Sequence, residues 1–192
     1  FGQARWQAAA LTLLPSSAWV RSSRMADPNL SSFLWSVADL LRGDYKQSEY
    51  GKVILPFTVL RRLDCVLEGT RAAVLKEKAK REAAGLNPEP FLLRTAGQLF
   101  YNTHPMSLKE LTGDAANIGE NLRAYIDAFS PAVRDIFESF EFHTQLDKLE
   151  KAGLLYLVAE KFKNIDLHPE TVSNAQMGAV FEELIRKFAE LS

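Results

Sequence analysis

The sequence has few residues of the kinds that form disulfides, metal sites or nucleophilic active sites. It contains one cysteine and three histidines among 192 residues. A single cysteine cannot form an internal disulfide, so we expect a cytoplasmic location and a packing role for Cys65. The histidines, His104, His143 and His168, lack metal-ligand spacing with one another or with the cysteine. We therefore expect them to have structural or surface roles, and we expect no metal ion.

Motifs for binding nucleotides and crossing membranes are also missing. The chain has no Gly-x-Gly-x-x-Gly loop and no phosphate-loop lysine. No apolar run reaches the roughly 18–20 residues that a membrane span needs. No pair of acids has a spacing that favours general acid–base work over surface solvation. The sequence thus predicts no catalytic residue, no cofactor-binding residue and no membrane contact.

Residues 44–67 predict a capped helix that is buried on nearly all sides. From Val53 onward, large apolar residues placed at about 100° per step cover most of a helix surface. Such a helix is typical of a protein core. Ser48 is expected to cap its first turn, and Glu49 suits the positive end of the helix dipole.

This helix has one polar side. Thr58, Arg61 and Arg62 fall within a single arc at the same angular step. We expect this side to face water, an acidic partner or a phosphate. The alternative is that the two arginines pair with acids of the bundle such as Asp64 or Glu68, because buried charges must be paired.

Amphipathic periodicity predicts further helices along the rest of the chain. Ser107 with Glu110, and Ser173 with Gln176, form capping boxes, and Gly85 is expected to end a helix. We find no alternation typical of a strand, and residues 91–101 stay unassigned. We therefore predict an all-α fold, an irregular bundle of about seven to nine helices. The predicted helices are residues 30–42, 44–67, 70–84, 115–129, 131–140, 142–151, 154–162 and 173–192, with a short one after residue 107.

The two ends of the chain differ from the middle. Residues 1–24 contain three arginines and no acid, and Met25 is a natural start. We therefore expect residues 1–24 to be a non-native or upstream leader that is poorly ordered. Residues 25–172 would form the helical bundle, and residues 173–192 a final helix. Glu182 with Arg186, and Glu183 with Lys187, would stabilise that helix as i,i+4 pairs.

Charge is distributed unevenly. Residues 46–81 hold nine basic and four acidic side chains, which gives +5, and the remainder of the chain carries −6. This asymmetry is typical of a basic face on an acidic body, or of an ordinary solvated helix surface.

Three separated blocks of the sequence carry a family resemblance. They are residues 33–67, residues 154–169 and residues 177–188. Together they resemble the N-terminal helical domain of the modification subunit of type I restriction-modification systems, over residues 25–192. The resemblance implies a subunit that methylates adenine N6 in DNA with S-adenosylmethionine. It also implies a specificity subunit that chooses the site, and a restriction subunit.

The same resemblance places the chemistry outside this chain. In this family the S-adenosylmethionine pocket and an Asn-Pro-Pro-aromatic motif lie in a separate α/β domain that follows the final helix. Here Asn87-Pro88-Glu89-Pro90 precedes Phe91, and the inserted glutamate gives the wrong spacing. We interpret this segment as a linker. The expected role of the chain is therefore assembly and closure around DNA, without a bound cofactor.

Residues that could perform this role can be named. The candidates for contacts with DNA phosphates are Lys46, Lys52, Arg61, Arg62, Lys76, Lys78, Lys80 and Arg81. Trp35 lies opposite the apolar stripe of its helix, so it is either covered by a second neighbour or kept for a partner; with Tyr45 it is a candidate protein contact. Two alternatives stay open: a stand-alone helical interaction module, and an enzyme in its own right.

Overall fold

The structure is a computed structural model that describes residues 28–191. The described part has no strand, only two isolated bridges. Nine of its α-helices have eight or more residues, and one further helix is a single turn, which confirms the predicted all-α bundle. Residues 1–24, the predicted leader, lie outside the described residues. The helices are α2 (Pro28–Leu41), α3 (Tyr50–Leu67), α4 (Arg71–Ala83), α5 (Glu89–Ala96), α6 (Leu108–Leu111), α7 (Ile118–Asp127), α8 (Pro131–Ser139), α9 (Phe142–Lys151), α10 (Leu155–Asn164) and α11 (Asn174–Glu190).

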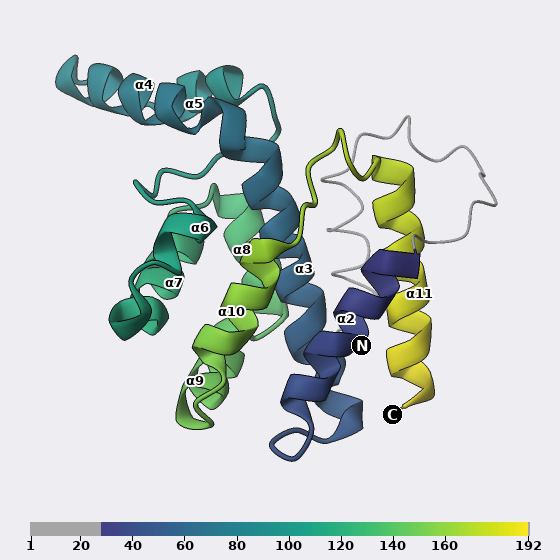
Figure 1. Cartoon of the computed structure of the whole chain (residues 1–192). Helices are drawn as coiled ribbons and strands as arrows, with labels where there is room; N and C mark the ends of the chain where they lie inside the picture. The colour runs from purple at the N-terminus through teal and green to yellow at the C-terminus, as the bar shows by residue number, and fades with distance from the viewer. Residues whose placement is uncertain (1–27, 192) are drawn as a thin grey trace.

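Helix α3 is the centre of the bundle. Fourteen of its 18 residues are buried, and α2, α9, α10 and α11 pack around it (Figure 1). The ring of Phe57 lies edge-on to Phe142 at 5.0 Å and is stacked with Phe162 at 5.3 Å. The prediction of a core helix in this part of the sequence is confirmed.

The start of α3 differs from the prediction. Ser48 does not cap the helix, because a 3-10 turn, Gln47–Glu49, precedes it and contains the serine. The carboxylate of Glu49 accepts a hydrogen bond from the backbone amide of Lys46 at 3.1 Å. This bond satisfies a free amide at the start of the turn, so the acid has the capping role that we expected of the serine.

The two predicted capping boxes are confirmed. Ser107 Oγ accepts a hydrogen bond from the amide of Glu110 at 3.4 Å, and the Glu110 carboxylate accepts one from the amide of Ser107 at 2.7 Å. Ser173 and Gln176 make the same pair of bonds at 3.2 and 2.8 Å. These residues define the starts of α6 and α11.

Helices α4 and α5 form an arm, residues 71–96, that projects from the end of α3 away from the bundle (Figure 1). The two helices pack mainly against each other. Val74 is the one buried residue of α4, and it faces an arm interior that includes Leu92 and Ala96 of α5. The guanidinium of Arg81 lies 3.8 Å from the centre of the Phe91 ring.

Helix α5 corrects part of the linker interpretation of residues 87–90. Asn87 and Pro88 do lie in the connection between α4 and α5, but Glu89 and Pro90 are the first two residues of α5. Asn87 Oδ1 accepts a hydrogen bond from the amide of Glu89 at 3.1 Å, just before the helix. Pro90 lies in the first turn of α5, where a missing amide hydrogen costs nothing.

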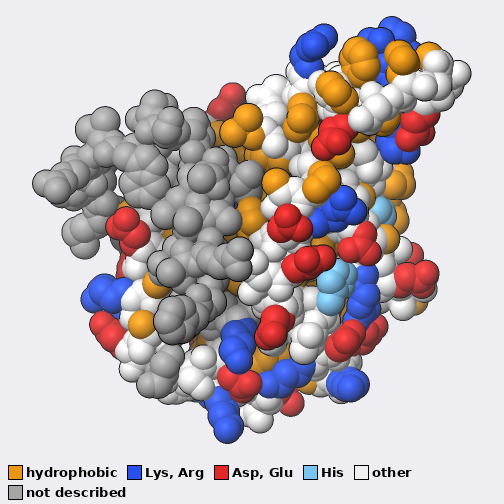
Figure 2. Space-filling view, turned by 180° about the vertical axis from the view of Figure 1, so that it is seen from behind, with side chains coloured by type: hydrophobic (Ala, Val, Ile, Leu, Met, Phe, Trp, Pro, Cys, Tyr) orange, Lys and Arg blue, Asp and Glu red, His pale blue; other side chains and the backbone are white. Residues whose placement is uncertain are grey.

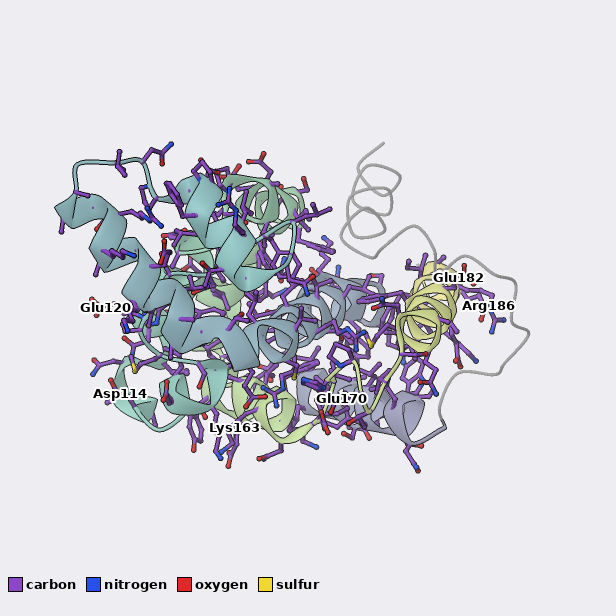
Figure 3. The ribbon with its side chains drawn as sticks, turned by 90° about the horizontal axis from the view of Figure 1, so that it is seen from above. Asp114, Glu120, Lys163, Glu170, Glu182 and Arg186 are labelled. Atoms are coloured by element: carbon purple, nitrogen blue, oxygen red, sulfur yellow. The ribbon has the colours of Figure 1, made fainter. Side chains whose placement is uncertain are left out.

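Helix α11 returns to the core and packs against α3 and α2. Its buried residues, Met177, Val180, Leu184 and Phe188, belong to the same hydrophobic cluster as α3. At Gly51 of α3 the approach is close, since a Cβ there would lie 3.2 Å from the Phe188 ring. The outer side of α11 carries Glu182 and Arg186, which point away from the bundle (Figure 3).

The expected pairing of Arg186 with Glu182 is not made. Arg186 Nη1 lies 3.6 Å from Glu190, one turn in the opposite direction along α11. Both of these side chains are more than half exposed. Such a pair contributes little to stability. None of the described helices combines the length and the hydrophobicity that a bilayer crossing requires.

Candidate interaction surfaces

The eight basic candidates do not form one surface. Lys46 and Lys52 lie near the start of α3, whereas four others lie on the arm beyond its end. An α-helix of 18 residues is about 27 Å long, so the two groups are at opposite ends of the bundle. Arg61 and Arg62 lie between these groups, on the polar side of α3.

Arg62 is a structural residue. Its side chain is buried, with 4% of the residue exposed. Nη1 donates to the carbonyl oxygens of Leu167 at 2.8 Å and Val172 at 2.6 Å, and Nη2 donates to Asn174 Oδ1 at 2.8 Å. These acceptors lie in and just after the loop between α10 and α11. In this structure Arg62 fixes that loop and does not reach solvent.

The rest of the polar side is also satisfied within the protein. Arg61 Nε donates to the carbonyl oxygen of Ile165 at 2.9 Å, and its Nη1 lies 2.8 Å from Asp64 Oδ2. Thr58 Oγ1 donates to the carbonyl of Ile54 at 2.6 Å. The expectation that this side faces water or a phosphate is therefore wrong for Thr58 and Arg62, because a loop distant in sequence covers it. The alternative, pairing of Arg61 with Asp64, is observed.

Asp64 is the centre of a buried polar cluster that we did not predict. Its side chain is 5% exposed. Besides the contact with Arg61, Oδ1 accepts from the Tyr125 hydroxyl at 2.7 Å, the Leu108 amide at 3.1 Å and Arg71 Nη2 at 3.3 Å. We call Asp64, Arg61, Arg71 and Tyr125 the Asp64 cluster. It joins α3, α4 and α7, and the start of α6.

The burial of this cluster shifts the pKa of its tyrosine. Desolvation raises the pKa of the Tyr125 hydroxyl well above its usual value, and the nearby Asp64 carboxylate adds to the effect. The phenol is therefore neutral and available as a donor. A sequence signal for the cluster was present, because an aspartate inside an apolar helix needs partners and an arginine stands three residues before it.

Of the four basic candidates on the arm, two are in ion pairs and two are not. Lys78 Nζ lies 3.0 Å from Glu82, and Arg81 Nε lies 2.5 Å from Glu77. Lys76 and Lys80 are exposed and make no ion pair with any described residue. With Ala72, Ala79 and Ala83 they form an exposed stripe along α4, which we call the lysine stripe.

The two aromatic candidates are largely covered. The Trp35 ring is half-buried, with its centre 5.9 Å from that of Phe188 in α11. Tyr45 is 5% exposed, and Lys148 Nζ lies 4.1 Å from its ring centre. The Tyr45 hydroxyl has no hydrogen-bond partner among the described residues, and burial raises its pKa to about 12.

The arm and the helices of residues 109–151, which we call the lower helices, carry opposite net charge. The arm has six basic and three acidic residues, whereas residues 109–151 have five basic and nine acidic ones. Figure 2 shows blue and orange side chains on the projecting arm and several red ones on the bundle below it. Asp114 and Glu120 lie on the side of the molecule away from α11 (Figure 3). A polyanion is therefore attracted to the arm and repelled by α7–α9.

The lower helices also enclose a surface hollow of about 320 Å³ between α7, α8 and α9. Its charged lining is Asp127, Asp135, Glu138 and Arg134. His143 lies at its edge, with Nε2 3.4 Å from Asp127 Oδ1. The described residues contain no group of His, Cys, Asp and Glu side chains that could hold a metal ion.

Residues 30–162 match the family model described as the HsdM N-terminal domain. The chain belongs to this family. It is the N-terminal domain of the methyltransferase subunit of a type I restriction-modification system, as the resemblance predicted. Within this HsdM N-terminal domain, the arm and the Asp64 cluster lie inside the matched range, and the Arg62-bound loop and α11 follow it. Neither a curated protein nor a solved structure matches the chain.

Proposed function

We propose that this domain holds DNA and the partner subunits of a type I modification complex, and that methyl transfer takes place in another part of the subunit. The observation that carries the DNA-binding part is the lysine stripe. It presents two unpaired ammonium groups on an arm that projects from the bundle. An ammonium group that is in no ion pair can bind a phosphate without first breaking one.

The side chains of the stripe are suited to contacts with the phosphate backbone of DNA. Lysine ammonium groups bind phosphates as point charges, and the short side chains of the neighbouring alanines let a DNA backbone approach the helix closely. Such contacts supply affinity and salt dependence but do not read the DNA sequence. Lys46 and Lys52 are exposed at the opposite end of α3, so they would meet a different segment of DNA.

The remaining parts of the proposal rest on the family. In this proposal the complete subunit methylates adenine N6 with S-adenosylmethionine, a specificity subunit selects the DNA site, and a restriction subunit joins the complex in the cytoplasm. The exposed edge of Trp35 is the proposed protein contact. Tyr45 would contact a partner only if it left the core, since 5% of the residue is exposed.

The salt dependence of DNA binding tests the stripe. We expect the 192-residue chain to bind a short duplex weakly, with log K falling linearly against log salt concentration. Replacing both Lys76 and Lys80 by alanine should reduce the steepness of that line by about 1.8, since each phosphate contact contributes about 0.9. Fluorescence anisotropy of a labelled duplex at several salt concentrations measures both slopes.

The matched control removes the same charge elsewhere. Lys109 and Lys151 are exposed lysines of the acidic lower helices. Their double replacement by alanine should leave the slope within error of the unmodified chain, although it lowers the net charge equally. If both double variants change the slope alike, only net charge matters and the stripe is not the DNA contact.

A further inference from the structure

The arm is joined to the bundle by two chain segments. The first is the turn Glu68–Thr70 between α3 and α4, in which Gly69 is exposed and has open space around its Cα. The second is residues 97–104, which follow α5. We call these segments the first and second roots of the arm. Because α4 and α5 bury their apolar side chains mainly against each other, the roots decide where the arm points.

The second root is hydrogen-bonded to the end of α7 and to the residues that follow it. The carbonyl of Tyr101 accepts from the amide of Ser130 at 3.0 Å, and the amide of Thr103 donates to the carbonyl of Ala128 at 3.0 Å. The side-chain amide of Asn102 donates to the carbonyl oxygen of Tyr125 at 2.9 Å, and this asparagine is buried.

The residue that follows the first root is hydrogen-bonded to the same tyrosine. Arg71 is the first residue of α4, and its Nη2 donates to the Tyr125 hydroxyl at 3.2 Å and to Asp64 Oδ1 at 3.3 Å. Its Nη1 donates to the carbonyl of His104, in the second root, at 3.0 Å. The hydroxyl of Tyr125 therefore binds the residue next to the first root, and its carbonyl binds the second root.

We propose that Tyr125, with Asp64 and Arg71, sets the direction of the arm relative to the bundle. These are positioning residues, and the proposal holds whatever the arm binds. Arg71 Nε is buried without a partner in the described structure, so the guanidinium has a spare donor for a second arrangement. Helix α4 is about 20 Å long, so a rotation of about 15° at the roots moves its far end by about 5 Å.

The test measures the direction of the arm by pulsed electron spin resonance. Spin labels are placed at two exposed positions, Ala83→Cys near the far end of α4 and Lys151→Cys at the end of α9, with Cys65→Ala in every sample. We expect a single narrow distance distribution for this parent chain. Tyr125→Phe removes the hydroxyl that links Asp64 to Arg71, and it should broaden the distribution or shift its mean by several ångströms.

Tyr45→Phe is the matched control. It also removes a buried hydroxyl, but one that has no hydrogen-bond partner among the described residues. We expect it to leave the distribution unchanged. Arg71→Lys keeps the charge but cannot span the three acceptors at once, so it should act like Tyr125→Phe.

Melting temperatures and circular dichroism of all variants separate direction from stability. The proposal is overturned if Tyr125→Phe and Arg71→Lys both keep the distance distribution of the parent chain. It is also overturned if Tyr45→Phe changes that distribution equally. If both cluster variants unfold where Tyr45→Phe stays folded, the cluster is a core element and does not position the arm.

Discussion

At the scale of single residues, Arg62 is a buried cation whose described partners are neutral oxygen atoms. It binds two carbonyls and one amide oxygen that lie 105 to 112 residues later in the chain. Burial lowers the pKa of its guanidinium, but an arginine in this environment stays charged at neutral pH. Three charge-assisted hydrogen bonds offset the cost of removing that charge from water.

The first prediction concerns this residue. Arg62→Ala leaves the carbonyls of Leu167 and Val172 without a buried donor, so we expect a loss of about 3 kcal/mol in the free energy of unfolding. Urea denaturation followed by circular dichroism measures it. Arg42→Ala is the control, because Arg42 pairs with Asp39 at the surface and 76% of its side chain is exposed. A loss for Arg62→Ala that is no larger than that for Arg42→Ala would contradict the assigned role.

The second prediction concerns His104 and pH. Its Nδ1 accepts a hydrogen bond from the Met106 amide at 3.0 Å, which requires an unprotonated nitrogen. Burial lowers the pKa of His104 below its usual value of 6.5; the Met106 carbonyl, 3.2 Å from Nδ1, opposes this shift, and Arg71 nearby adds to it. Its contribution to stability is therefore fully present above pH 6.5 and is lost as the pH falls through the lower folded-state pKa.

Denaturation at pH values on both sides of 6.5 measures this loss. His104→Gln cannot titrate, so its stability should lack this component and fall less steeply with acid. Nuclear magnetic resonance of the ring protons gives the pKa directly. A folded-state pKa for His104 at or above 6.5 would show that the assigned bond is wrong.

Individual partners could be predicted from the sequence only where they lie close along the chain. The contact of Arg61 with Asp64 spans three residues and was among the alternatives. The partners of Arg62 could not be found, because backbone carbonyls have no signature in the side-chain pattern. The link from Asp64 to Tyr125 spans 61 residues and needed the fold.

At the scale of elements, the crossing of α3 and α11 depends on a glycine. Gly51 lets the ring of Phe188 approach the α3 backbone, and an added methyl group would lie 3.2 Å from that ring. The third prediction is that Gly51→Ala is destabilising by about 1–3 kcal/mol, because the Phe188 side chain must move away from the added methyl group inside a packed core. Thermal unfolding measures this change.

Gly178 provides a control on the partner helix. It lies inside α11, and a Cβ there meets no atom within 4 Å. Gly178→Ala should stabilise the protein by about 0.5–1 kcal/mol through the higher helix propensity of alanine. Opposite signs for the two substitutions would support close packing at Gly51, and equal signs would contradict it.

Helices could be predicted where the residues that define their ends lie close together in the sequence. Periodicity and the two capping boxes placed most starts and ends, as for α6 and α11. Helix α5 was missed because it has eight residues and begins in a proline-rich segment. The Ser48 cap was wrong because the extra turn before α3 is held by Glu49, which lies one residue further along.

At the scale of the whole molecule, the all-α class followed from composition and periodicity. The grouping of the basic candidates did not, because a charge count along the chain ignores how the chain is folded. Residues 46–81 include both ends of α3 and most of α4, so their excess positive charge is spread over at least two regions. The lysine stripe on the arm could be defined only with the structure.

The hydrogen bonds between Arg62 and the loop before α11 also have a consequence for the synthesis of the protein. The ribosome completes α3 long before it synthesises Asn174, which is 112 residues after Arg62. At about 5–20 residues per second this interval is about 6 to 22 seconds. During that time α3, which is buried on most sides in the folded protein, lacks α11 and the oxygen atoms that accept hydrogen bonds from Arg62. A nascent chain at this stage is a natural substrate for chaperones that bind exposed apolar segments.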